Sequence, residues 1–210
     1  MKKFITFEGM DGSGKSTQVE LLGKSLKKIN VDCFLTREPG GTTISEKIRS
    51  ILVNETIEDI KPKTELLLIY AARHQHIKEK LLPNLKKRIV ICDRFYHSTF
   101  CYQILSNSIP FSVLQSLHKT FADNLYPDIT FFIDTEPKIS INRSLKIKNN
   151  EKRFELKKHE YHKVVYNGFL DFVNNNNNFF KVDGNEKIMK IHQKIIDILN
   201  KKKITKLTNP

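Results

Sequence analysis

The sequence predicts an α/β protein in which a five-stranded parallel sheet is covered by helices on both faces. Short apolar segments alternate with longer segments of helical spacing along nearly all of the 210 residues. This alternation is typical of a parallel sheet built with crossover helices. The apolar segments carry hydrophobic residues at adjacent positions, so we expect both faces of the strands to be buried. With 39% apolar residues, the chain can form one sizeable core, and we expect a single three-layer α/β/α domain over residues 1–210.

The first strand is expected at residues 4–7, and a loop and a helix follow it. Residues 9–16 read GMDGSGKS and fit the phosphate-loop pattern G-x-x-x-x-G-K-[ST] at every fixed position. A helix of amphipathic spacing runs from Gln18 to about Ile29. Glycine lets the backbone approach phosphate closely, and the N-terminus of a helix attracts anions. The segment therefore predicts a site for a nucleoside triphosphate.

The rest of the chain continues the alternation of strands and helices. Further strands are expected at 31–36, 88–93, 128–134 and 179–182, and helices at 44–53, 63–85, 98–105, 111–121, 138–147, 155–173 and 186–200. Pro83 is expected to kink or end the long helix 63–85. The asparagine-rich run 174–178 is expected to form a loop, and residues 201–210 a frayed tail.

Polar residues follow the ends of several predicted strands, where a parallel sheet gathers its functional groups. Arg37, Asp93–Arg94 and Asp134–Thr135 should lie at the same edge as the phosphate loop. Asp93 ends an apolar strand, which is where a carboxylate holds Mg²⁺ in phosphate-loop proteins, and Ser16 is the expected hydroxyl ligand of that ion. Arg37, Arg73 and Arg94 near a triphosphate suggest that a second anion binds there.

The formal net charge of +13 admits two interpretations, a surface for nucleic acid or anionic membrane and a solvated lysine-rich surface. Because the lysines are spread along the whole chain, we favour the solvated surface and expect neither a nucleic-acid nor a membrane partner. No apolar segment approaches the roughly 18 residues of a membrane span. The first strand begins too early to leave room for a signal peptide, so a cytoplasmic location is expected.

Cysteines and histidines predict neither a disulfide framework nor a metal cluster. The three cysteines, Cys33, Cys92 and Cys101, lack C-x-x-C spacing. Two of the three lie in or beside apolar runs, and we expect two buried thiols. His74 and His76 are two residues apart on a predicted helix and so face different sides. His159 and His162 can share a helix face, but no third ligand is evident, and we expect solvated surface there.

Five sequence blocks occur in the order found in thymidylate kinases. They are FEGMDGSGKSTQ (7–18), TREPGGT (36–42), YAAR (70–73), DRF followed by STFCYQ (93–103), and RFE (153–155). The chain therefore resembles a bacterial-type thymidylate kinase over nearly its whole length. The resemblance implies a Mg²⁺-dependent enzyme that transfers the γ-phosphoryl group of ATP to dTMP, giving dTDP and ADP in dTTP synthesis. It also implies a homodimer and a lid at about residues 143–155.

The resemblance further implies roles for the matching residues. The ATP-binding residues would be Gly9, Met10, Asp11, Gly12, Ser13, Gly14, Lys15, Ser16 and Thr17. The dTMP-binding residues would be Asp11, Arg37, Ile69, Arg73, Arg94, Ser98, Thr99, Tyr102 and Gln103. Arg37 and Arg94 would clamp the acceptor phosphate, and Arg73 would hydrogen-bond the thymine edge. Asp11 would face the sugar 3′-hydroxyl, while Tyr102 would crowd the 2′ position and so select deoxyribose.

Two departures from the family pattern concern the base and the lid. Ile69 stands where the family usually places a phenylalanine against thymine, so the base platform is either aliphatic or supplied by a neighbour. Gly12 stands where some members place an arginine, which implies the type whose lid supplies the positive charge. Arg153 is the first candidate for that catalytic lid cation and Arg143 the second, although Lys146 and Lys148 also lie in the stretch.

The expected mechanism follows from charge. A phosphate monoester has a second pKa of about 6, so the acceptor is mostly a dianion at pH 7 and needs no general base. Catalysis should therefore consist of positioning and charge neutralisation by Lys15, Arg37, Arg94, Mg²⁺ and a lid cation.

Three other functions are weighed against this one. A kinase of another small acceptor remains open because of Ile69. A nucleic-acid-dependent ATPase is suggested by the net charge but lacks interleaved aromatic and basic residues. A regulatory GTPase would need an N-K-x-D block, which the sequence lacks.

Overall fold

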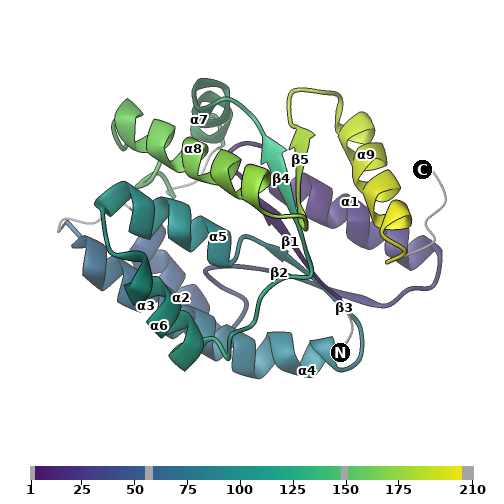
Figure 1. Cartoon of the computed structure of the whole chain (residues 1–210), viewed down its shortest axis with the longest axis horizontal. Coiled ribbons are helices and arrows are strands. Elements are labelled where there is room, and N and C mark those ends of the chain that lie inside the picture. The colour runs from purple at the N-terminus through teal and green to yellow at the C-terminus, as the bar shows by residue number, and fades with distance from the viewer. Residues whose placement is uncertain (1–2, 55–58, 148–150, 205–210) are drawn as a thin grey trace.

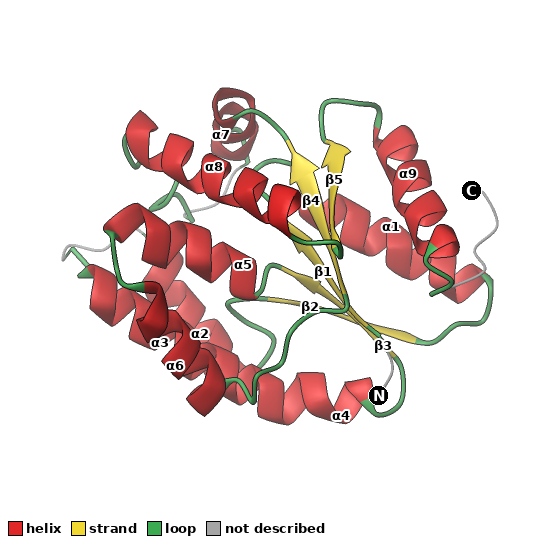
Figure 2. Cartoon of the chain, viewed as in Figure 1, coloured by secondary structure: helices red, strands yellow, loops and turns green. Residues whose placement is uncertain are grey.

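A computed structural model describes residues 3–54, 59–147 and 151–204 and confirms the parallel five-stranded sheet. The strands are β1 (Phe4–Glu8), β2 (Cys33–Arg37), β3 (Ile89–Asp93), β4 (Ile129–Asp134) and β5 (Phe179–Asp183), in the spatial order β2-β3-β1-β4-β5. Every pairing is parallel, so the carboxyl ends of the strands share one edge. Figure 2 shows the sheet between its layers of helices.

Helices cover both faces of this sheet. They are α1 (Lys15–Lys28), α2 (Thr43–Val53), α3 (Pro62–His76), α4 (Leu82–Leu85), α5 (Tyr96–Thr99), α6 (Phe111–Phe121), α7 (Pro137–Leu145), α8 (His159–Asn175) and α9 (Ile188–Lys201). In Figure 1, α1 and α9 lie on one side of the strands, and α3, α4, α5, α6 and α8 lie on the other. The predicted three-layer arrangement is therefore confirmed.

Alternate residues of the central strands supply the two cores. On the side of α1 and α9, Ile5, Phe7 and Phe131 are buried against Leu22 of α1 and Ile195 of α9. On the opposite side, Phe4, Val90 and Cys92 pack among residues of α3 and the segments that follow it. Because both faces are apolar, β1, β3 and β4 are fixed in the middle of the sheet. The edge strand β2 differs from our expectation, since its residues are only half-buried or exposed.

The predicted long helix 63–85 follows one path but contains a π-helical turn at Ile77–Leu81. Pro83 does not end the helix, because it lies in the first turn of α4, where a residue without an N–H group is tolerated. The predicted kink stays a prediction. The predicted helix 98–105 begins earlier, at Tyr96, and passes through a second π-helical turn at Phe100–Ile104.

Two predictions near the C-terminal half also need correction. The predicted helix 155–173 begins only at His159, because residues 151–157 form turns in which the Arg153 N–H donates to the Val53 carbonyl at 3.3 Å. In the predicted tail, Ile204 packs partly buried against the α1/α9 core instead of fraying. Residues 148–150 of the predicted lid, which include Lys148, and residues 205–210 of the tail lie outside the described residues.

Candidate functional site

The phosphate loop, Arg37 and the Asp93–Arg94 pair meet at the carboxyl edge of the sheet. β1 leads into the loop, β2 ends at Arg37 and β3 ends at Asp93. All of them contribute to the lining of one large cavity. Asp134 ends β4 at the same edge but instead pairs with Lys181 at 3.0 Å. Among the described residues, Asp134 and Thr135 are not part of the lining of this cavity.

The loop encloses a buried cation. Lys15 is the first residue of α1, and its Nζ donates to the Met10 carbonyl oxygen at 2.8 Å. Burial and the neighbouring Arg94 charge lower the pKa of Lys15 to about 8, although nearby carboxylates oppose the shift. The cavity is lined by Asp11, Gly12, Gly14, Lys15, Ser16 and Thr17 of the loop, while Gly9, Met10 and Ser13 are buried outside its lining.

Gly12 is required for the close approach of α7. Its φ is +79°, and a Cβ at this position would lie 2.2 Å from the carbonyl oxygen of Ser140 in α7. A larger residue at position 12 is therefore excluded, and α7 brings Arg143 and Ser144 to the wall of the cavity. The Arg143 guanidinium donates to the Gly184 carbonyl at 3.1 Å. The second candidate for the lid cation thus already lines the phosphate-loop cavity.

Ser16 and Asp93 form the candidate Mg²⁺ site. The Ser16 hydroxyl donates to Asp93 Oδ2 at 2.5 Å, so a hydroxyl and a carboxylate oxygen adjoin each other beside Lys15. Mg²⁺ prefers oxygen ligands, keeps several waters and is often bound by only one or two protein groups together with phosphates. The oxygen atoms of Ser16 and Asp93 are therefore suitable ligands for Mg²⁺. Within the described ranges, no group of three or more His, Cys, Asp or Glu residues forms a metal cluster.

Arg94 and Asp11 stand at the junction of the cavity with a second pocket, whose lining they share. Arg94 Nη2 lies 2.5 Å from Asp11 Oδ1, and its guanidinium is 5.0 Å from the centre of the Tyr102 ring. The Tyr102 hydroxyl also donates to Asp11 at 3.3 Å. Burial alone would raise the pKa of Asp11, but the charges of Arg94 and Lys15 outweigh it and lower the pKa to about 2.

The turn that carries Arg94 is held by a buried carboxylate. Glu8 accepts hydrogen bonds from the Phe95 N–H at 2.9 Å and from the N–H and hydroxyl of Ser98. The same hydroxyl accepts from Arg94 Nη1 at 2.9 Å. Burial raises the pKa of Glu8, even though these donors oppose the shift. Glu8 therefore links the end of β1 to the position of the Arg94 side chain.

Arg73 points from α3 into the second pocket and is itself buried. Its Nε donates to Glu38 at 2.7 Å and its Nη2 to the Thr99 hydroxyl at 2.8 Å. Its Nη1 is buried without a close hydrogen-bond partner among the described residues, and the guanidinium also interacts with the Tyr70 side chain, whose ring centre lies 5.0 Å away. A buried donor without a partner is costly, so a ligand carbonyl in this pocket would complete the set.

The second pocket brings together most of the predicted nucleoside-binding residues. Its lining consists of Asp11, Glu38, Pro39, Arg49, Leu52, Val53, Ile69, Arg73, Arg94, Phe95, Ser98, Thr99, Tyr102, Gln103 and Phe154. Arg37 is the exception among the predicted dTMP residues, because it lines the large cavity and is not part of the lining of the second pocket. There the half-exposed Arg37 side chain pairs with Glu46 at 2.8 Å.

Sequence reasoning missed Arg49 and Phe154, both of which line the pocket and the cavity. Arg49 of α2 pairs with Glu151 at 2.7 Å and donates to the Pro39 carbonyl. Phe154 packs against the cluster that contains Ile69, and its ring stands perpendicular to that of Tyr102. It thus supplies an aromatic neighbour beside the aliphatic Ile69. Phe154 belongs to the RFE block, so the sequence offered a reason to include it among the site residues. Arg49 lies in an ordinary helical pattern that does not distinguish it from other helix residues.

Arg153, the first candidate for the lid cation, is not among the described residues that line the cavity. Its guanidinium pairs with Glu65 and donates to the Leu52 carbonyl at 2.5 Å. Glu65 also accepts from the predicted pocket residue Gln103 at 2.7 Å. Arg153 therefore connects the segment before α8 to α2 and α3 through these two contacts. Its catalytic role stays a prediction.

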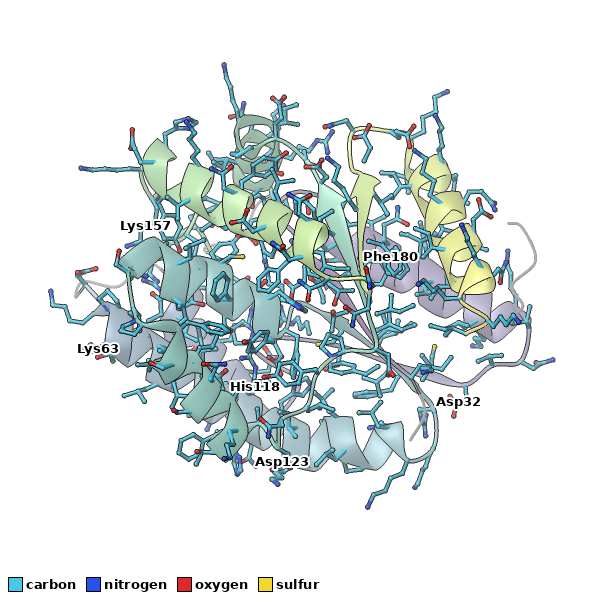
Figure 3. The ribbon with its side chains drawn as sticks, in the orientation of Figure 1. Asp32, Lys63, His118, Asp123, Lys157 and Phe180 are labelled. Carbon is cyan, nitrogen blue, oxygen red and sulfur yellow. The ribbon has the colours of Figure 1, made fainter. Side chains whose placement is uncertain are left out.

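The burial of the cysteines and histidines and the positions of the lysines test the remaining predictions. Cys92 and Cys101 are buried and Cys33 is half-buried, which agrees with the expectation of two buried thiols. His162 is also buried, so the expectation of a solvated surface there is wrong. Figure 3 labels Lys63 of α3 and Lys157 before α8, two exposed lysines that come from different segments of the chain. In the part of the chain that the structure describes, no helix has the length and apolar character of a membrane span.

Comparisons with known proteins identify the family to which the chain is similar. The family model for thymidylate kinase matches residues 7–195. The chain is 46% identical to the thymidylate kinase of Rickettsia canadensis over 82% of this chain and 83% of that protein. It is 39% identical to the thymidylate kinase of Pelobacter propionicus over 93% of each.

A solved structure supports the fold as well. The crystal structure of thymidylate kinase from Ehrlichia chaffeensis superimposes with a TM-score of 0.76 at 34% sequence identity, covering 94% of this chain and 98% of that one. The matches extend over the sheet, the phosphate loop and the second pocket. The chain belongs to the thymidylate kinase family.

Proposed function

We propose that this protein transfers the γ-phosphoryl group of ATP to dTMP, giving ADP and dTDP. The observation that carries the proposal is the position of the Asp11–Arg94 pair, which joins the phosphate-loop cavity to the pocket that contains Arg73. A donor triphosphate and a nucleoside monophosphate would therefore meet at a cation that both can reach. This arrangement suits in-line transfer between two bound nucleotides.

On the donor side, residues 9–17 would hold the ATP phosphates. Backbone N–H groups at the start of α1 and the Lys15 ammonium face the same cavity, which favours a polyanion. Ser16 and Asp93 would hold Mg²⁺, which would neutralise phosphate charge when bound.

On the acceptor side, Arg37 and Arg94 would bind the dTMP phosphate, and the unpaired Nη1 of Arg73 would donate to a carbonyl oxygen of thymine. Asp11 would accept from the 3′-hydroxyl group, and Tyr102 would fill the space of a ribose 2′-hydroxyl. Ser98, Thr99 and Gln103 would complete the wall of the pocket, as they line it here. Ile69 would present an aliphatic surface to the base, with the Phe154 ring close by.

The acceptor needs no general base, since its phosphate is largely a dianion at pH 7. What the protein must do is hold two anions close together and offset their repulsion. Lys15, Arg37 and Arg94 would provide part of this charge, since all three line the cavity, as do Arg49 and Arg143. We assign the additional lid cation to Arg153, which would have to leave Glu65, with Arg143 as the alternative that already lines the cavity.

We further propose a homodimer, as the family resemblance implies, and a cytoplasmic location, as expected from the sequence before the first strand. Exposed apolar residues on α2, α3 and α6 support a dimer, among them Ile44, Leu67 and Phe121. Light scattering of the purified chain tests this proposal, and a monomer at all concentrations would contradict it.

The substrate assignment is tested by ADP release with Mg-ATP against dTMP, dUMP, dGMP, dAMP, CMP and shikimate. We expect turnover largely confined to dTMP. Preference for another monophosphate would retain the phosphate-loop kinase and reject the thymidylate assignment, whereas ATP hydrolysis stimulated by DNA would support a nucleic-acid-dependent ATPase.

A further inference from the structure

His76 is buried beside the acceptor pocket although it is not one of the residues that line it. It is the last residue of α3 and follows Arg73 by three positions, so the two side chains share a face of the helix. Its side chain is fully enclosed, with 0% exposure. A fully buried imidazole needs partners for both ring nitrogens, and the structure supplies them.

Both nitrogens contact the strand end that carries Arg37. His76 Nδ1 lies 2.9 Å from Glu38 Oε1, and Nε2 lies 2.7 Å from the Thr36 hydroxyl. The pKa of Glu38 is held below its ordinary value because Arg73 and His76 outweigh the effect of burial. As a carboxylate, Glu38 can only accept, so Nδ1 donates to it. In the neutral ring, Nε2 then accepts from Thr36, and the imidazole bridges the two residues that flank Arg37.

The same carboxylate orients the proposed base-reading residue. Glu38 Oε2 accepts from Arg73 Nε at 2.7 Å, so one side chain connects His76 to Arg73. The Arg73 guanidinium is fixed on its other side by Thr99. A continuous network of hydrogen bonds therefore runs from Thr36 through His76 and Glu38 to Arg73.

The turn after β2 is shaped to admit the imidazole ring. Gly41 has a φ of +86°, and a Cβ there would lie 2.6 Å from His76 Cδ2 and Nε2 and 2.8 Å from the Thr36 hydroxyl oxygen. A side chain at position 41 would displace the ring from both of its partners. Gly41 therefore leaves the space that His76 occupies.

We infer that His76 is a positioning residue that aligns Arg73 with Arg37, and so aligns base recognition with the binding of the acceptor phosphate. It contacts neither nucleotide in this scheme and acts through Glu38 and Thr36. The inference rests on the proposed function, because it assigns the acceptor pocket to dTMP. It predicts that loss of the imidazole impairs the use of dTMP while leaving ATP binding intact.

The test compares His76→Leu, which removes both hydrogen bonds, with His76→Gln, whose amide can donate to Glu38 and accept from Thr36. The matched control is His192→Leu, which removes a buried histidine of α9 that bonds only Ser25 in the described structure. Initial rates would be measured over both substrates, and melting temperatures for all variants.

We expect His76→Leu to lower kcat/KM for dTMP by about 10- to 100-fold, the usual range for an unsatisfied buried partner, with KM for ATP within about twofold. His76→Gln should recover most of the loss, and His192→Leu should leave both substrates unaffected. If His76→Leu does not fold, Thr36→Val removes one of the two bonds and should still cost about threefold to tenfold toward dTMP.

An unchanged kcat/KM for dTMP in His76→Leu or Thr36→Val would overturn the inference. Equal losses toward ATP and dTMP would overturn it as well, because they would indicate general destabilisation. Failure of the unmodified protein to phosphorylate dTMP would instead reject the proposed function, so the two failures are distinguishable.

Discussion

The two sides of the site are built in different ways. The donor side comes mainly from one continuous stretch, residues 9–17, where a strand, a loop and a helix follow each other directly. The acceptor side is assembled from separate elements, since Arg73 comes from α3, Glu38 follows β2 and Thr99 ends α5. A local motif positions its own groups, whereas the acceptor side depends on buried hydrogen bonds between elements. Substitutions on the two sides should therefore change different kinetic constants, namely turnover or the constants for ATP on the donor side and the constants for dTMP on the acceptor side.

The largest effect is expected on the donor side, from Lys15→Ala. Removing the ammonium that faces the phosphates should lower kcat by about 10³-fold or more, as for other preorganised charges. The fold should persist, because the lost contact is one hydrogen bond to the Met10 carbonyl. Arg94→Ala should have a similar effect on turnover. Rapid-quench kinetics measures turnover, and circular dichroism checks that each variant is folded. Near-normal turnover in either variant would show that the substituted residue is not needed for phosphoryl transfer.

A smaller and more selective effect is expected on the acceptor side, from Arg73→Lys. Lysine keeps the charge but cannot donate to Glu38, Thr99 and a base carbonyl in the same planar arrangement. KM for dTMP should rise about 10- to 100-fold, while KM for ATP stays nearly constant. Steady-state rates over a grid of both substrates separate the two constants. A parallel rise in both would contradict the division into two sides.

The pH dependence of kcat/KM for ATP should also distinguish the donor side from the acceptor side. The expected change is smaller than those of the substitutions above. The pKa of Lys15 is lowered to about 8, so the ammonium is present below pH 8 and is lost as the pH rises above it. We expect kcat/KM for ATP to be level below that pH and to fall by up to about tenfold per pH unit above it. In Lys15→Arg the break should vanish, since guanidinium stays protonated. A break that persists in that variant would assign the titration to another group.

The same contrast explains what the sequence predicted and what it did not. Phosphate-loop residues and strand ends follow local patterns, so the sheet and the position of Asp93 were predictable. Arg49 and Phe154 were missed because their places depend on how α2 and the segment before α8 pack together. The expectation that Pro83 could end the helix was wrong because Pro83 lies in the first turn of α4, and this position depends on where the π-helical turn Ile77–Leu81 stops.

His162 shows a signal that was present but unused. It lies three residues before Val165 and seven before Phe169, which is the spacing of a single helix face. All three side chains are buried on α8. Periodicity alone would therefore have placed this histidine in the interior. The same spacing relates His76 to the buried Ile69 and Arg73 of α3. Its hydrogen-bond partners Thr36 and Glu38, in contrast, lie far away in the sequence and could not be predicted from a local pattern.

The central claim is that both sides hold their nucleotides close enough for direct transfer. The most direct measurement follows the label from [γ-³²P]ATP in the presence of Mg²⁺ and dTMP, and separates dTDP from inorganic phosphate over a single turnover. We expect nearly all of the label in dTDP, with one ADP formed for each dTDP. Release of the label as inorganic phosphate, or its appearance on a different acceptor in preference to dTMP, would contradict the account.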